Sequence, residues 1–145
     1  MDHSSTFAIS AAGMAVERAR VEVAALNLAN AHTTQAVGQP GFRPLRVVAQ
    51  PAVAGAAFSA LLAAGDASGA APVYQLEPAS VAARQVHEPG HPLADARGFV
   101  SYPGVDPAAE MMGLMSATRA YEANVAAMNT ARTLALKALE IGGNA

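Results

Sequence analysis

The chain has 145 residues, the size of one compact domain or of a core with one small insert. Hydrophobic residues make up 52% but aromatic residues only 5%, and the excess is alanine, which suits close helix packing. A net charge of −2 provides no basic field for nucleic acid or an anionic membrane, and the lack of cysteine excludes disulfide and thiol chemistry.

Residues 4–30 contain no proline and have the periodicity of one long helix. Two apolar rows run along it. One alternates spacings of three and four, as in a coiled coil, and the other repeats every seven residues on nearly the opposite face. A surface helix of a monomer normally has one apolar stripe, so two rows predict that one face packs within the chain and the other on neighbouring chains. The first row is Ile9, Ala12, Val16, Ala19, Val23 and Leu26, and the second is Phe7, Met14, Val21 and Leu28.

The middle of the chain has the composition of a small β-rich insert. Glycine and proline interrupt it repeatedly, and β-forming residues such as Val47 and Val48 lie between the interruptions. The expected elements are a connector at 31–41, a strand at 42–50, a strand or short helix at 52–63, a loop at 64–72, one or two short strands at 73–86, a loop at 87–98 and a strand at 99–102.

A second long helix is predicted to begin with an N-cap at Asp106 and proline in the first helical position, and to end near Ile141. Gly113 costs about 1 kcal/mol relative to alanine inside a helix. A close helix contact would explain this glycine, as it would Gly13 in the first helix. The predicted apolar seam is Met111, Leu114, Thr118, Tyr121, Val125, Met128, Ala135 and Leu139.

This order predicts a mainly α fold with a small β-rich insert, in the α+β class. The insert joins the inner ends of the helices, so we expect them to pair as an antiparallel coiled coil. Residues 1–35 and 104–145 would form this discontinuous helical domain, and residues 36–103 the insert. Two helices enclose little core, so their remaining apolar surface predicts partner chains.

The sharpest chemical pattern is His87-Glu88-Pro89-Gly90-His91, which has the H-E-x-x-H spacing of zinc proteases. That motif requires a helix to place both histidines on one face, and Pro89 prevents one here. A rigid turn is the favoured interpretation, and a zinc-dependent hydrolase stays as an alternative. With no nucleophile constellation or nucleotide-binding glycine loop, we expect no enzyme activity, no cofactor and no metal site.

Two further groups of side chains have open interpretations. Methionines 111, 112, 115 and 128 are typical of adaptable packing, with a soft-metal or promiscuous binding surface as the alternative. Asn27, Asn30, Asn124 and Asn129 are unusual on apolar helices. They are either exposed or capping, or they are buried and set the register between helices.

Three segments carry a resemblance to a known family. Asn27-Leu28-Ala29-Asn30-Ala31-His32-Thr33-Thr34 is similar to the motif that closes the first helix of flagellar rod, hook and hook-associated proteins. Arg119-Ala120-Tyr121-Glu122-Ala123-Asn124 and the stretch 137–142 resemble the second signature of these proteins. The loop 87–95, with 98–100 and 103–105, resembles the proximal rod members of the flagellar basal-body rod family. The chain departs from the usual pattern at His32, Glu88 and Gly104, and Glu88 completes the zinc-like spacing.

The resemblance implies a structural subunit of the proximal rod, the drive shaft that transmits motor torque across the periplasm. Such subunits leave through the flagellar type III export apparatus without a cleaved signal, and the N-terminus here lacks the pattern of a secretory signal. The implied partners are copies of the chain, other rod proteins and the rod-base adaptor, with no nucleic acid and no membrane insertion. Another axial subunit of the family and a free helical adaptor or chaperone are the remaining alternatives.

The predicted assembly interface combines the rows of both helices with their asparagines. It comprises Phe7, Ile9, Met14, Val16, Val21, Val23, Leu26, Asn27, Leu28, Asn30, Met111, Leu114, Met115, Tyr121, Asn124, Val125, Met128 and Leu139.

Overall fold

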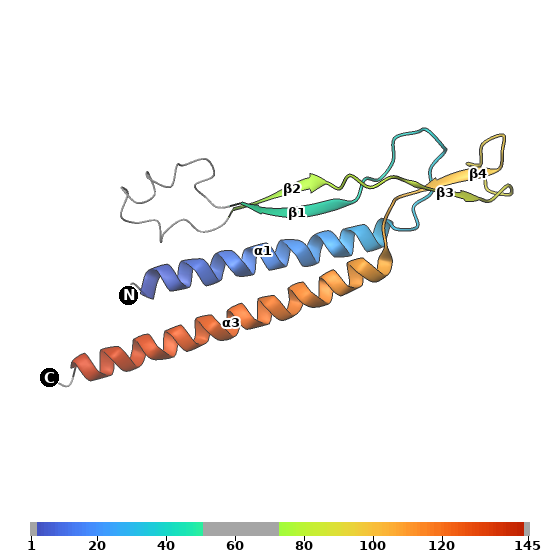
Figure 1. The fold of residues 1–145 in the computed structure, drawn as a ribbon. Helices are drawn as coiled ribbons and strands as arrows, with labels where there is room; N and C mark the ends of the chain where they lie inside the picture. Colours follow the sequence, from blue (N-terminus) through green and yellow to red (C-terminus); the bar gives the residue numbers. More distant parts are fainter. Residues whose placement is uncertain (1–2, 51–72, 144–145) are drawn as a thin grey trace, which may run out of the picture. The chain divides into compact units, whose positions relative to one another are not determined.

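The computed structural model describes residues 3–50 and 73–143 and contains two long helices and two small pairs of strands (Figure 1). The prediction of a mainly α chain with a small β insert is confirmed. The elements expected at 52–63 and 64–72 lie outside the described residues. The order of elements is α1 (His3–Asn30), β1 (Leu45–Gln50), β2 (Val73–Pro78), β3 (Arg84–His87), β4 (Phe99–Tyr102) and α3 (Pro107–Gly143).

Helix α1 ends at the residue that the sequence predicts. The Asn30 side chain donates from Nδ2 to the Leu26 carbonyl at 2.9 Å, and the Thr33 amide donates to the Asn30 carbonyl at 3.0 Å. The second bond satisfies a carbonyl that the last helical turn leaves without an intrahelical partner, and the first ties the Asn30 side chain back to the preceding turn. Of the two interpretations of Asn30, the capping one therefore describes its hydrogen bonding in this chain.

Helix α3 begins at the predicted cap. Asp106 Oδ1 accepts hydrogen bonds from the backbone amides of Ala108 at 3.0 Å and Ala109 at 3.4 Å. Pro107 fits the first helical position because that residue needs no amide donor. The helix ends at Gly143 rather than at Ile141, so the final glycines lie inside its last turn.

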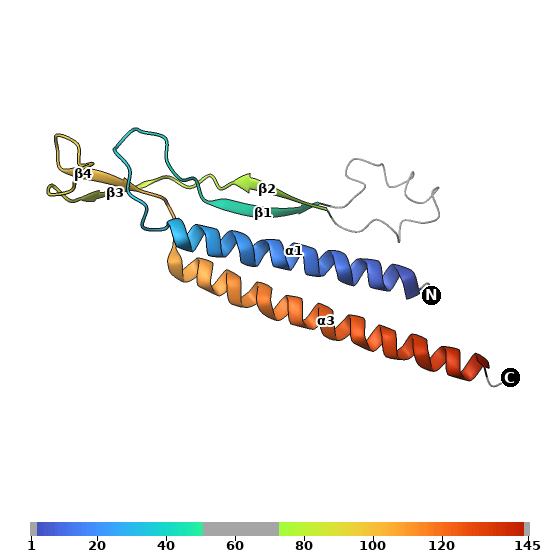
Figure 2. The same ribbon diagram turned by 180° about the vertical axis from the view of Figure 1, so that it is seen from behind.

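The strands form two small sheets, one of β1 with β2 and one of β3 with β4. Both pairs run antiparallel, as Figures 1 and 2 show from opposite sides. In the second sheet Arg84 pairs with Tyr102 and His87 with Phe99. Gln35 adds an isolated bridge to Ser101, with hydrogen bonds of 3.0 Å in both directions. The connector after α1 is thereby attached to β4.

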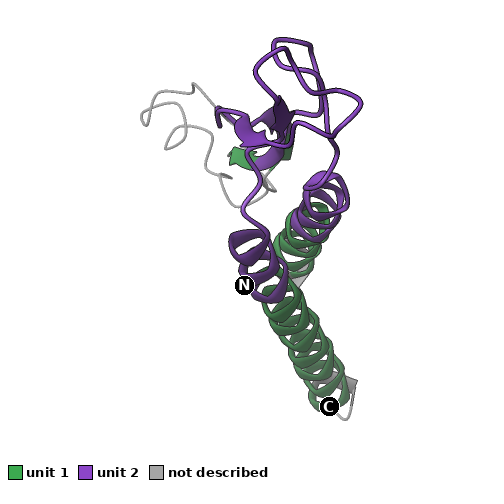
Figure 3. Cartoon of the chain, turned by 90° about the vertical axis from the view of Figure 1, so that its right-hand side faces the viewer, with its two compact units in different colours: residues 1–19, 48–75, 117–145 green, residues 20–47, 76–116 purple. Residues whose placement is uncertain are grey.

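The chain divides into two compact units, coloured in Figure 3, and the division passes through both helices. Unit 1 comprises residues 1–19, 48–75 and 117–145, and unit 2 comprises residues 20–47 and 76–116. The expected separation of a helical domain from an insert stays a prediction. Unit 1 buries Ser10, Val16, Ala19 and Ala117, whereas unit 2 buries Val23, Ala24, Asn27, Ala31, Val100 and Ser101.

The two helical glycines differ in their surroundings. A Cβ added at Gly13 would lie 3.0 Å from Nδ2 of Asn124, so the close helix contact predicted there is confirmed within unit 1. No such contact forms at Gly113 within the described chain, because a Cβ built there has no neighbour within 4 Å outside its own stretch of helix. Gly113 carries its helix cost without a close neighbour in the described structure.

Candidate assembly surface

The predicted interface residues separate into three groups by burial. Val16, Val23 and Asn27 are buried within the chain. The exposed group is Ile9, Leu26, Met111, Met115, Tyr121 and Leu139. The half-buried group is Phe7, Met14, Val21, Leu28, Asn30, Leu114, Asn124, Val125 and Met128. A buried residue acts first on folding of the subunit, so only the last two groups offer surface to another chain. Their role in assembly stays a prediction.

The two apolar rows of α1 are covered unequally. The middle of the first row is buried at Val16, Ala19 and Val23, whereas its ends are not, with Ile9 53% exposed and Leu26 43% exposed. The second row is half-buried along its whole length. Residues at both ends of the first row and all along the second therefore keep apolar surface that a second chain can cover.

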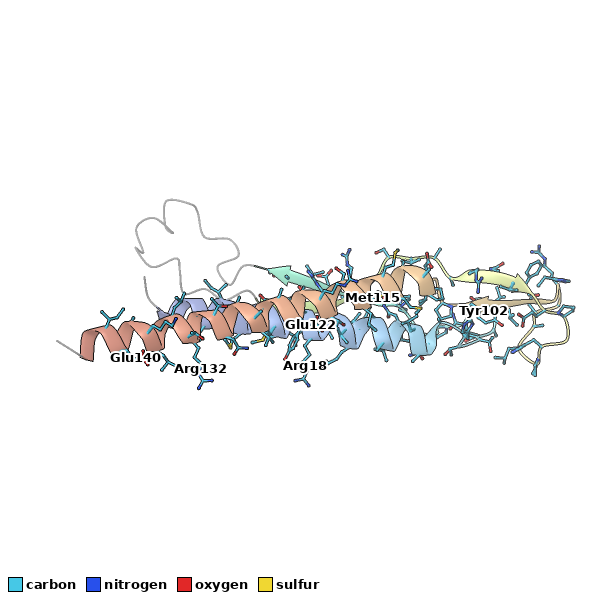
Figure 4. The ribbon with its side chains drawn as sticks, turned by 90° about the horizontal axis from the view of Figure 1, so that it is seen from below. Arg18, Tyr102, Met115, Glu122, Arg132 and Glu140 are labelled. Atoms are coloured by element: carbon cyan, nitrogen blue, oxygen red, sulfur yellow. The ribbon has the colours of Figure 1, made fainter. Side chains whose placement is uncertain are left out.

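Helix α3 exposes large apolar side chains near both of its ends. Met111, Met112 and Met115, the last labelled in Figure 4, are 58%, 68% and 55% exposed. Positions 111, 112 and 115 lie within about 100° of arc on a helix, so the three side chains share one face. We name these three residues the methionine face. Toward the C-terminus, Leu134, Leu136, Leu139 and Ile141 are all more than half exposed.

The predicted seam of α3 differs from the row that the described chain itself buries. It included Thr118, which is exposed, and omitted the neighbouring Ala117, which is buried. It also omitted Leu134 and Leu136 from the candidate surface, because a single row of three-and-four spacing passes between them. A count of apolar residues on every face of the helix, rather than on one seam, identifies both from the sequence.

Asn27 joins three parts of unit 2 through its side-chain amide. Nδ2 donates to the Leu45 carbonyl and to Glu110 Oε1, both at 2.9 Å. Oδ1 accepts from the Leu45 amide, also at 2.9 Å. The side chain is 1% exposed, so these bonds replace all contact with water. Sequence reasoning identified Asn27 but missed both partners, since neither lies near it in the chain.

The His87–His91 segment forms a turn in which the two histidines make different contacts. His91 Nδ1 accepts from the Leu93 amide at 3.1 Å, and Nε2 lies 3.3 Å from Thr34 Oγ1. Nε2–H is the donor in the second bond, because a neutral imidazole that accepts at Nδ1 carries its proton on Nε2. His87 packs against Phe99 with 5.1 Å between ring centroids. Among the described residues, no group of three acidic, histidine or cysteine side chains could hold a metal ion.

Glu88, the third member of that pattern, belongs to a separate contact. Its carboxylate accepts from the Tyr102 hydroxyl at 3.0 and 3.2 Å. This hydrogen bond is the main reason that the pKa of Tyr102 lies above its ordinary value of 10.0, followed by burial and by the charge of Glu88. Arg84 lies over the tyrosine ring, 5.6 Å from its centroid, and opposes the shift. The contact joins the turn to β4.

A hollow of about 360 Å³ in unit 2 is lined by Phe42, Val81 and Pro103, among others. Its sole charged lining residue is Arg43, so it contains no pair of acidic and basic groups of the kind used in acid–base catalysis.

None of the described helices is both long enough and apolar enough to cross a membrane. The exposed helix faces, which carry large apolar side chains, are the candidate assembly surface.

Known proteins match this chain over nearly its whole length. It is 39% identical to flagellar basal-body rod protein FlgC of Salmonella typhimurium over 137 residues, which cover 94% of this chain and 95% of that protein. The FlgC of Bacillus subtilis is 38% identical, with 92% and 94% covered, and that of Aquifex aeolicus 30% identical, with 92% of each covered. The chain belongs to the FlgC family. A family model described as "Flagellar basal body rod FlgEFG protein C-terminal" also matches residues 96–141.

Membership of the FlgC family confirms the resemblance that the sequence motifs indicated, including its proximal rod branch. The chain is a structural protein of the flagellar basal-body rod and serves motility. The family model begins just before β4 and covers nearly all of α3. The methionine face and the exposed C-terminal residues Leu134, Leu136, Leu139 and Ile141 therefore all lie within the residues that this family model matches.

Proposed function

We propose that this chain is a proximal rod subunit that assembles helically with copies of itself and with other rod proteins, and that the resulting shaft transmits torque. The observation that carries the proposal is 39% identity to a FlgC over 94% of the chain. The exposed apolar surface on α3 supports it, because contiguous exposed apolar side chains mark sites of protein–protein contact. The role is structural and needs no catalysis, cofactor or metal.

In the assembled subunit the terminal helices pair as an antiparallel coiled coil. Two contacts support this pairing. Gly13 closely approaches Asn124 in unit 1, and Asn27 bonds to Glu110 in unit 2. Fourteen residues separate Gly13 from Asn27 in α1, and the same number separates Glu110 from Asn124 in α3. Fourteen residues are two heptads, so one antiparallel register without a slip accommodates both contacts.

The half-buried and exposed rows of α1 and α3 pack on neighbouring subunits in the rod. The direct test is swimming of a strain in which a variant replaces the native protein. Tyr121, which is 39% exposed, is a suitable position. Tyr121→Asp should abolish swimming because assembly would bury an unpaired charge, whereas Tyr121→Phe should preserve it. Normal swimming of the Tyr121→Asp strain would count against the proposed surface.

The ends of the helices gain order on assembly, because an isolated helix with exposed apolar faces lacks the packing that stabilises it. Circular dichroism of the purified subunit at low concentration should show less helix than the 28 residues of α1 and 37 residues of α3 together require. Helicity should increase on assembly. Full helicity of the dilute subunit, with no gain on assembly, would contradict this part of the proposal.

The subunit works in the periplasmic part of the basal body after type III export, and the rod-base adaptor and the export apparatus are partners on this route. Export without cleavage predicts that the subunit in purified basal bodies has the same N-terminus as the subunit inside the cell. Mass spectrometry of the rod-derived protein measures this directly. A shorter N-terminus in assembled rods would show that a leader is removed.

A further inference from the structure

The side chain of Asn27 bonds to one residue of β1 as a neighbouring strand would. Its amide both donates to the Leu45 carbonyl and accepts from the Leu45 N–H, each at 2.9 Å. A paired strand makes this same two-way exchange with the residue opposite it in an antiparallel ladder. At Leu45 the Asn27 side chain, from the last turn of α1, therefore takes the place of a residue on a neighbouring strand.

The pairing of β1 with β2 explains why Leu45 is available for this exchange. The Ala79 amide donates to the Pro44 carbonyl at 2.7 Å, and Arg46 forms an ion pair with Glu77 at 3.0 Å. Pro44 therefore faces β2, and backbone groups in a strand alternate in direction, so those of Leu45 point to the opposite edge of β1. An open edge is where a foreign strand would add, and Asn27 occupies it at Leu45.

The remaining N–H of the Asn27 amide connects this edge to α3. It donates to Glu110 Oε1 at 2.9 Å, in the first turn after the Asp106 cap. The two N–H groups of the Asn27 amide thus donate to the Leu45 carbonyl on β1 and to the Glu110 carboxylate on α3. Its oxygen accepts from the Leu45 N–H on β1. The partners lie 18 and 83 positions from Asn27 in the sequence, so the contact fixes segments that the chain does not hold together locally.

We infer that Asn27 is a positioning residue that sets the direction in which both terminal helices leave the β strands, through a donor–acceptor pattern that only asparagine satisfies. Aspartate would present oxygen to both the Leu45 carbonyl and Glu110. Alanine or leucine would leave three part-buried polar groups, the Leu45 N–H, the Leu45 carbonyl and the Glu110 carboxylate, without this partner. Glutamine is one methylene longer, and the interior around a residue that is 1% exposed has no room for it.

Reversal of the donor–acceptor polarity tests the contact with Glu110 independently of function. In Asn27→Asp two carboxylates face each other, whereas in Asn27→Asp with Glu110→Gln the new amide can donate to the new carboxylate. The readout is hydrogen exchange of the Leu45 amide in the full chain. Exchange should be at least about tenfold faster in Asn27→Asp, since loss of about 1.4 kcal/mol is tenfold in an equilibrium constant.

The double variant should recover at least half of the lost protection on a logarithmic scale, and Glu110→Gln alone should change it by less than about threefold because Gln still offers an acceptor. Asn129→Asp, an exposed substitution in α3, is the matched control and should leave Leu45 unchanged. If Asn27→Asp unfolds the chain, recovery of folding by Glu110→Gln is the supporting result. Equal Leu45 protection in native and Asn27→Asp chains, or a double variant no better than Asn27→Asp, would overturn the inference.

The effect of Asn27 on rod assembly rests on the proposed function. Swimming assays distinguish failure of the positioning role from failure of the proposed assembly surface. Asn27→Asp should swim poorly, and the double variant should recover swimming in proportion to its recovered Leu45 protection. If Asn27→Asp loses protection of the Leu45 amide and its strain still swims normally, the positioning role of Asn27 is overturned, even when the Tyr121→Asp strain does not swim. Normal swimming of Tyr121→Asp as well would instead count against the proposed assembly surface itself.

Discussion

Val23 and Leu26 lie in the same apolar row of α1, yet the structure predicts opposite effects when each is replaced by aspartate. Val23 is 7% exposed, whereas Leu26 is 43% exposed. The sequence pattern treats them alike, since they are three residues apart on one face of the helix. A comparison of Val23→Asp with Leu26→Asp therefore tests the tertiary packing and not the pattern.

The magnitudes follow from burial. Val23→Ala should lower the free energy of unfolding by about 2 kcal/mol, from two lost carbon atoms and a partly relaxed cavity. Val23→Asp adds a buried charge without a partner, which costs several kcal/mol more, on the order of 4 in total or above. Since domains of this size have ~5–15 kcal/mol of stability, this change removes much of it. Leu26→Asp, by contrast, should cost about 0.5 kcal/mol.

The assay has two parts, urea denaturation of the purified chains and swimming of the corresponding strains. Val23→Asp should fail both. Leu26→Asp should lower the unfolding midpoint far less than Val23→Asp does and still lose swimming, because its exposed surface is part of the predicted assembly interface. Equal loss of stability in the two aspartate variants would refute the division of the row into interior and surface. A swimming Leu26→Asp strain would remove that residue from the interface.

Further outcomes follow from other contacts. Glu88→Gln should lower the pKa of Tyr102 toward 10.0, measured by ultraviolet titration with Tyr102→Phe as the control. In the native protein the raised pKa stabilises the fold below pH 10.0, and this stabilisation is lost as the pH rises through the pKa of the folded state. Gly13→Val should destabilise the subunit by about 1–3 kcal/mol through overlap with Asn124, more than Gly13→Ala does, and equal thermal midpoints would contradict the close approach. His91→Ala should cost about 1 kcal/mol and leave swimming intact, whereas stoichiometric tightly bound zinc in the native protein would restore the metal hypothesis.

The helix boundaries could be predicted because their determinants are local. The Asp106 side chain caps α3 at its N-terminus, and the Asn30 side chain donates to the Leu26 carbonyl at the C-terminus of α1. Capping depends on hydrogen bonds over three or four residues, so a single stretch of sequence contains the information. The same holds for the turn at His87–His91, where the prolines exclude a helix and thereby the zinc motif.

The burial of the helix rows could not be predicted in the same way. Periodicity places Val23 and Leu26 on one face but does not say which of them another element covers. It likewise selected Thr118, which is exposed, over the buried Ala117. Small residues such as alanine give a weak hydrophobic signal, yet they are the ones that fit where backbones approach closely.

By itself the sequence determined the two helices, most of the strands, the rigid turn and the family, because each depends on short stretches of chain. Only the tertiary structure showed that Asn27 bonds to Leu45 and Glu110, that Gly13 lies against Asn124, and which apolar residues remain exposed. A hydrogen bond between residues 83 positions apart leaves no periodic pattern in the sequence. Such contacts are decided by how the folded segments pack, since only packing brings distant donors and acceptors within bonding distance.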